Sequence, residues 1–83
     1  LMDNSVDNIK KILVNKYPGV EFRIKSQNTH ETVISWWEGE VESLDVNQFI
    51  LDNSCLSYIG SVSTEFGEYG IVRNLASYTY ANP

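Results

Sequence analysis

The sequence predicts an α+β fold: a two-layer sandwich in which helices cover one face of an antiparallel sheet. Three observations favour this class. Apolar residues recur at helical spacing over residues 6–17 and again over 44–53. Residues 20–26 alternate apolar and polar side chains, as half-buried strands do, and residues 31–37 follow a short polar turn as a second strand. Residues 55–80 are rich in strand-forming residues. The expected order is α-β-β-α-β-β in a single domain, residues 1–83, with Leu1 a cloning remnant before Met2.

The first helix is expected to end at the Pro18-Gly19 pair, because proline cannot continue a helix and glycine accepts a positive φ. Asn4 or Ser5 can cap its start. Asp7 in the first turn and lysines toward the end suit the helix dipole. One apolar stripe faces the core and consists of Val6, Ile9, Leu13 and Tyr17, with Ile12 beside it.

A hairpin should follow, with strands over residues 20–26 and 31–37 joined by the polar turn QNTH. The second strand ends in two adjacent tryptophans, Trp36 and Trp37. Successive side chains on a strand point to opposite faces, so at most one indole enters a one-sided core. The other indole faces outward, where it either lies under Lys25 or Arg23 of the neighbouring strand as a cation–π pair or stays open as an anchor for a partner.

The second half of the chain should contain a helix over 44–53 and two strands over 55–64 and 71–80. Asp45 with Gln48 three residues on resembles a capping pair. Asn53 can end the helix in the left-handed region, and Gly60 can form a bulge. The segment EFGEYG reads as a turn. The last strand is expected to be either long or broken near Asn74.

Charge is unevenly distributed along the chain. The formal net charge is −5, and no Lys or Arg occurs between Ser26 and Val72. This acidic segment disfavours direct DNA or RNA binding, which requires a basic surface. It either serves solubility alone or forms a negative face that steers toward a basic protein. Its carboxylates are Glu31, Glu38, Glu40, Glu42, Asp45, Asp52, Glu65 and Glu68.

Residues that carry catalysis or bind metals are few. Cys55 is the only cysteine and His30 the only histidine. We expect Cys55 to be a small buried residue and His30 an exposed turn residue, since nothing suggests a lowered thiol pKa or a third catalytic group. One Cys and one His do not make a zinc site. The segment EGEVESLD lacks the residue order of an EF-hand. We therefore predict no catalytic residues, no metal and no cofactor.

A surface for a protein partner is the remaining candidate site. A tryptophan among carboxylates has the composition of an interface, an aromatic anchor surrounded by charge. We predict that the partner-binding residues are Trp36, Trp37, Glu38, Glu40, Glu42 and Asp45.

The setting is expected to be cytoplasmic. A lone cysteine fits a reducing compartment. The N-terminus lacks the pattern of a signal peptide, and no apolar run approaches the roughly 20 residues of a membrane-spanning helix.

Two segments resemble a known family. YPGVEFRIKS (residues 17–26) and ISWWEG (34–39) are similar to the key pieces of a large polyvalent protein-associated domain, a small α+β module of phages and conjugative elements. The resemblance covers about residues 10–50. The chain departs from that pattern in its shorter first turn, which has no glycine, and in lacking a proline after the Glu-Gly turn.

The resemblance implies a mobile genetic element as the source. We therefore expect a non-enzymatic inhibitor of a host protein with a basic surface, such as a defence nuclease, of the anti-CRISPR or anti-restriction type. The alternatives are a structural or accessory module that self-associates as a homodimer, and an immunity protein or antitoxin for a toxin nuclease. A less favoured alternative is nucleic-acid binding through Lys10, Lys11, Lys16, Arg23 and Lys25.

Overall fold

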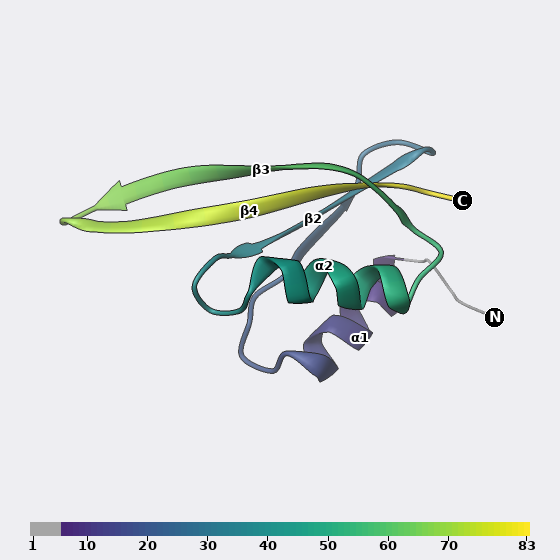
Figure 1. The fold of residues 1–83 in the computed structure, drawn as a ribbon, viewed down its shortest axis with the longest axis horizontal. Coiled ribbons are helices and arrows are strands. Elements are labelled where there is room, and N and C mark those ends of the chain that lie inside the picture. The colour runs from purple at the N-terminus through teal and green to yellow at the C-terminus, as the bar shows by residue number, and fades with distance from the viewer. Residues whose placement is uncertain (1–5) are drawn as a thin grey trace.

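A computed structural model describes residues 6–83 and confirms the predicted fold class and element order (Figure 1). Two helices lie on one face of a four-stranded antiparallel sheet. The helices are α1 (Val6–Lys16) and α2 (Ser43–Asp52). The strands are β1 (Arg23–Ser26), β2 (Glu31–Trp37), β3 (Ser57–Glu68) and β4 (Ile71–Ala81). The expected caps Asn4 and Ser5, and Leu1, lie outside the described residues.

The strands are ordered β1-β2-β4-β3, so the last strand lies inside the sheet. β4 pairs with the whole of β2, from Glu31 opposite Ala81 to Trp37 opposite Leu75. On its other side it forms a long hairpin with β3. This hairpin projects beyond the helical layer (Figure 1), so its outer part has no helix beneath it.

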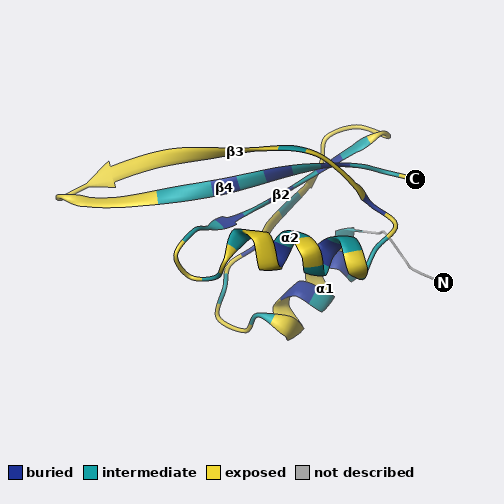
Figure 2. Ribbon diagram, viewed as in Figure 1, coloured by how far each residue is buried: buried dark blue, intermediate teal, exposed yellow. Residues whose placement is uncertain are grey.

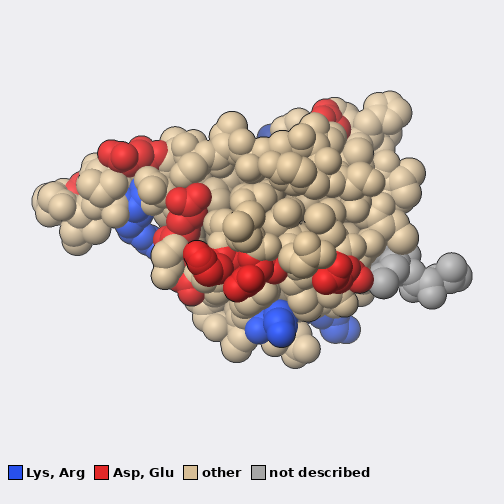
Figure 3. Space-filling view, viewed as in Figure 1, with Lys and Arg blue, Asp and Glu red and all other residues tan. Residues whose placement is uncertain are grey.

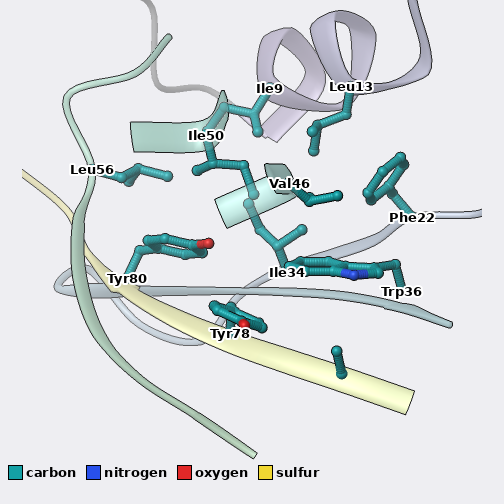
Figure 4. Close-up of a cluster of buried hydrophobic side chains, with 11 residues drawn as sticks. Ile9, Leu13, Phe22, Ile34, Trp36, Val46, Ile50, Leu56, Tyr78 and Tyr80 are labelled. Carbon is teal, nitrogen blue, oxygen red and sulfur yellow. The ribbon is translucent and has the colours of Figure 1, made fainter. Parts of the chain in front are cut away.

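The core lies between the helices and the sheet (Figures 2 and 4). β2, and β4 from Leu75 onward, alternate buried and half-buried residues, as a sheet with one covered face requires. The predicted stripe of α1 is confirmed, with Ile9 and Leu13 fully buried. The buried hydrophobic residues are Ile9, Leu13, Phe22, Ile34, Trp36, Val46, Ile50, Leu56, Ala76, Tyr78 and Tyr80.

Two hydrogen bonds attach α2 to the sheet. The hydroxyl of Tyr80, 0% exposed, donates to Oδ1 of Asn47 over 2.7 Å. The indole Nε1 of Trp36 donates to Oγ of Ser43 over 3.3 Å. The ring of Trp36 is also stacked on Tyr78, with 4.8 Å between centroids. Tyr80 and Trp36 can therefore be buried, because the hydroxyl of one and the indole N–H of the other each have a hydrogen-bond partner.

Strand boundaries differ from the prediction at the start of β1 and at the turn between β3 and β4. β1 begins at Arg23 rather than at residue 20, because Val20 still belongs to the turn after α1, where its N–H donates to the carbonyl of Tyr17. The predicted turn over residues 65–70 is only two residues long. Tyr69 and Gly70 both have positive φ, 52° and 77°, as a type I′ hairpin turn requires. β3 therefore continues to Glu68, and β4 is long rather than broken.

The helix caps also differ from the prediction. Glu42 is the N-cap of α2 and makes no side-chain cap hydrogen bond. Gln48 donates to Asp52 over 2.8 Å instead of forming a capping pair with Asp45. Asn53 has a φ of −117°, outside the left-handed region, and its side chain donates to the carbonyl of Phe49. The bulge expected at Gly60 is confirmed by the register shift between Tyr58 and Gly60.

The two residues considered for catalysis lie in loops. His30 is exposed in the β1–β2 turn, as predicted. Cys55 is exposed as well, so the prediction that it is buried is wrong. It lies between α2 and β3, where Leu56 rather than Cys55 fills the core. Neither helix of residues 6–83 is long and apolar enough to cross a membrane.

Tyr80 should make stability fall at alkaline pH. Burial chiefly, and then the hydroxyls of Tyr78 and Tyr58, raises the pKa of Tyr80 well above its ordinary value of 10.0. Because the folded protein holds the neutral form, stability is fully present below pH 10 and decreases as pH rises above it. We expect Tyr80→Phe to flatten this decrease and to cost about 1–3 kcal/mol at neutral pH, since Asn47 loses its donor.

The measurement is urea unfolding across the alkaline range, with Tyr69→Phe as the matched control. Tyr69 is 94% exposed, so its substitution should leave both the stability and its pH dependence unchanged. Equal alkaline slopes for the Tyr80→Phe variant and the unmodified protein would contradict the assignment.

Candidate functional site

The two tryptophans of β2 have different environments. Trp36 is 1% exposed and packs among Phe22, Tyr78 and the helices. Its inclusion among the partner-binding residues is therefore wrong, because no partner can reach its ring. Trp37 is half-buried and points to the face of the sheet that the helices leave open. The expectation that the two indoles face opposite sides is confirmed.

Trp37 lies in a compact cluster of side chains on the open face. The guanidinium carbon of Arg73 lies 4.2 Å from the centroid of the Trp37 ring. The ring of Phe66 meets Trp37 edge-on, with 5.7 Å between centroids. Arg73 also donates to Oε1 of Glu40 over 3.1 Å. We call these four residues, Trp37, Phe66, Arg73 and Glu40, the Trp37 cluster.

The strand order explains why Arg73, rather than Arg23 or Lys25, covers the indole. β1 pairs with β2 only as far as Arg23 opposite Ser35, so no residue of β1 lies beside Trp37. β4 continues past that point, and Arg73 is two residues from Leu75, the partner of Trp37. The prediction that Lys25 or Arg23 forms the cation–π pair is therefore wrong: the cation over Trp37 is Arg73 of β4.

The predicted carboxylates divide between two sides of the molecule. Glu40 turns toward the open face and pairs with Arg73. Glu38 is half-buried, and its backbone N–H donates to the carbonyl of Asn74 over 2.8 Å. Glu42 and Asp45 are exposed at the start of α2, in the helical layer. The indole and the acidic residues therefore do not form one continuous surface.

A second acidic group lies along α2. Glu42, Asp45 and Asp52 are exposed and separated by three and seven residues, which places them along one side of the helix. Figure 3 shows acidic side chains in a row across this face of the molecule. Among the described residues, the ion pairs are Arg23–Glu21 and Arg73–Glu40, so none of these three has a cationic partner within 4.0 Å. We call them the α2 acidic row.

Apolar surface accompanies the α2 acidic row. Leu44 is 77% exposed between Glu42 and Asp45. On the other side of the row is an open groove between the helices, with a volume of about 450 Å³. Burial and the nearby carboxylate of Asp45 raise the pKa of Tyr17 in this groove. The groove is lined by Lys16, Tyr17, Asp45, Gln48, Phe49 and Asp52.

Sequence reasoning missed several residues of these two sites. Asp52 could have been found, because it falls seven residues after Asp45 on a predicted helix. Leu44 could have been found as an apolar residue outside the Val46–Phe49–Ile50 stripe. Arg73 and Phe66 could not be assigned to Trp37, because their proximity depends on the pairing of β4 with β2 and β3.

The basic residues do not form one surface. Lys10, Lys11 and Lys16 are exposed on α1, in the helical layer. Arg23 and Lys25 lie opposite Ser35 and Val33 and share their open face of the sheet. A nucleic-acid backbone would have to contact both sides of the molecule to use all five cations.

Neither a metal site nor a relative was found. No group of three or more His, Cys, Asp or Glu side chains within residues 6–83 could hold a metal ion. No known family, curated protein or solved structure was found to match the chain. The predictions about catalysis, cofactors and family therefore remain predictions.

Arg73 should control the exposure of Trp37. Removing the guanidinium in Arg73→Ala uncovers one face of the indole, so we expect a red shift of tryptophan emission and stronger quenching by acrylamide. Trp36 is sealed, so the quencher reports mainly on Trp37. The loss of a partly exposed cation–π contact and an exposed ion pair should cost about 1 kcal/mol of stability.

Arg23→Ala is the matched control, because Arg23 is exposed and its closest acidic group is Glu21 at 3.9 Å. It should leave the emission spectrum and the quenching unchanged. Equal quenching in the two variants would show that Arg73 does not shield the indole.

Proposed function

We propose that this protein is a non-enzymatic inhibitor that binds a host protein with a basic surface through the α2 acidic row. The observation that carries the proposal is the exposure of Glu42, Asp45 and Asp52 without a cationic partner among the described residues. Unpaired carboxylates are available to a partner, whereas Glu40 already pairs with Arg73.

The charge pattern supports a protein partner of opposite sign. The net charge is −5, and α2 has no basic residue in its last turn to offset its acidic residues. A surface of one sign accelerates encounter with a surface of the other sign. Leu44 is exposed next to these carboxylates and supplies the apolar surface that the centre of a protein interface contains.

The partner class follows from the same chemistry. Proteins that bind nucleic acid present rows of Lys and Arg to phosphates. A helix carrying carboxylates along one side can occupy such a row in place of phosphates. A nuclease of a host defence system is the partner that fits both this chemistry and the resemblance of residues 17–26 and 34–39 to a module of phages and conjugative elements.

Binding should weaken when salt screens the row or when its charges are removed. The screening length falls from about 10 Å at about 0.1 M salt to about 3 Å at about 1 M. We expect the triple change Glu42→Gln, Asp45→Asn and Asp52→Asn to weaken capture of the partner from host lysate at least tenfold at low salt. The captured protein is then tested for nuclease or nucleic-acid-binding activity with and without the inhibitor.

The matched control removes the same charge elsewhere, with Glu21→Gln, Glu31→Gln and Glu68→Gln. It should retain most of the affinity, because net charge changes equally while the α2 acidic row is intact. An affinity that is independent of salt, or an equal loss in both triple variants, would rule out this row as the binding surface. A captured protein whose nucleic-acid activity is unaffected would rule out inhibition.

A further inference from the structure

The outer edge of β3 is long, and its protection is limited to the bulge at Tyr58 and the carboxylates of Glu65 and Glu68. β3 pairs with β4 on one side, and no described strand pairs with its other side. It is 12 residues long and contains no Lys, Arg or Pro. Its regular register runs from Gly60 to Glu68, beyond the bulge at Tyr58. Such an edge offers a row of unpaired backbone N–H and C=O groups to another strand.

The opposite edge of the same sheet is protected. β1 is only four residues long, and Arg23 and Lys25 are exposed on it. Short length and charged side chains are the devices by which sheet edges avoid pairing with other chains. The two edges of this sheet therefore differ in how well they are protected against another strand.

We propose that the partner is a second copy of this protein, paired antiparallel through β3 about a two-fold axis at Thr64. Thr64 is the midpoint of the regular stretch from Gly60 to Glu68. The pairing forms one continuous eight-stranded sheet, with the helices of both copies on the same face. The contacts of this dimer come from β3, whereas the carboxylates of the α2 acidic row come from the helical layer.

The side-chain pattern of β3 is complementary to itself in this register. Val62 of one copy lies opposite Phe66 of the other, twice, on the open face. These side chains are 66% and 49% exposed in the single chain, so the pairing buries apolar surface. Glu65 lies opposite Ser63, an uncharged residue. Parallel pairing in register would instead place Glu65 directly opposite Glu65, which is destabilising.

The hairpin turn fits the same arrangement. Tyr69 is 94% exposed at the tip of the hairpin. In the proposed register it reaches the start of the second copy's β3, near Ile59, which is 52% exposed. In this register the part of each hairpin that projects beyond the helices (Figure 1) lies beside the start of the other copy's β3.

The size of the contact predicts a weak dimer. Nine paired residues extend about 30 Å along the edge. A standard interface buries about 800 Å² on each partner, which is about 15% of the 5476 Å² accessible surface of this protein. An edge contact lies at the lower end of that range. We therefore expect dissociation in the micromolar range, and a mass that rises from 9.5 kDa toward twice that value with concentration.

Sedimentation equilibrium of the full chain at increasing concentration tests the proposal. Val62→Lys places a charge at the paired edge and should raise the dissociation constant at least tenfold. Ile71→Lys is the matched control: Ile71 is 65% exposed, lies on the same hairpin and is on β4. It should dimerise like the unmodified protein. A strictly monomeric protein, or an equal effect of the two substitutions, would overturn the proposal.

Disulfide trapping tests the register independently of any loss of folding. In a Cys55→Ser background, Thr64→Cys should form a disulfide-linked dimer on oxidation, because residues at the two-fold axis lie opposite themselves. Glu68→Cys should not, since Glu68 lies opposite Gly60. Cross-linking of Glu68→Cys but not of Thr64→Cys would overturn the antiparallel arrangement.

The response to salt distinguishes this dimerisation from binding to a basic partner. Both copies are negatively charged, so added salt screens their repulsion and should leave dimerisation unchanged or stronger. Binding through the α2 acidic row should weaken under the same conditions. A dimer that dissociates as salt rises would show that charge, and not the β3 edge, holds it together.

Discussion

The alternation of side chains along β2, fixed by the burial of Trp36, is the constraint on which the rest of the structure depends. Trp36 lies opposite Ala76, a small residue that leaves room for its ring against Phe22 and Tyr78. A shift of one residue would exchange Trp36 with Trp37 and turn the buried Ile34 to the open face as well. The register of β2 therefore determines both the core and the position of the Trp37 cluster.

The tryptophan ring also fixes the position of the second helix. The bond from its Nε1 to Ser43 anchors the start of α2, and the bond from Tyr80 to Asn47 anchors the next turn. The apolar side of α2, with Val46 and Ile50, is thereby turned into the core. Its other side must then carry Glu42, Asp45 and Asp52 outward. The α2 acidic row is therefore exposed because the opposite side of α2 packs on the sheet.

Local patterns in the sequence predicted most of the fold. The stripe of α1, the alternation of β2 and the bulge at Gly60 depend on neighbouring residues only, and all three are present in the structure. The boundaries were less predictable. Gly67 suggested a turn, yet the strand continues through it because the Tyr69-Gly70 turn determines where the hairpin reverses.

The candidate site was less predictable than the fold, for a physical reason. The predicted surface combined residues that are close in sequence, from Trp36 to Asp45. A strand followed by a helix packed on one face of its sheet sends such neighbours to different sides. The residues that do surround Trp37 come from β3, β4 and the loop before α2. Strand order, which the residue pattern did not reveal, decides these contacts.

The position of β4 inside the sheet has a consequence for folding during synthesis. β4 follows every other element in the chain, yet β2 pairs with one side of it and β3 with the other. Until the ribosome has released β4, only the β1–β2 hairpin can form its strand pairs. Trp36 and Ile34 must remain without their β4 partners for that time, so a chaperone that covers apolar segments of nascent chains would act on β2 first.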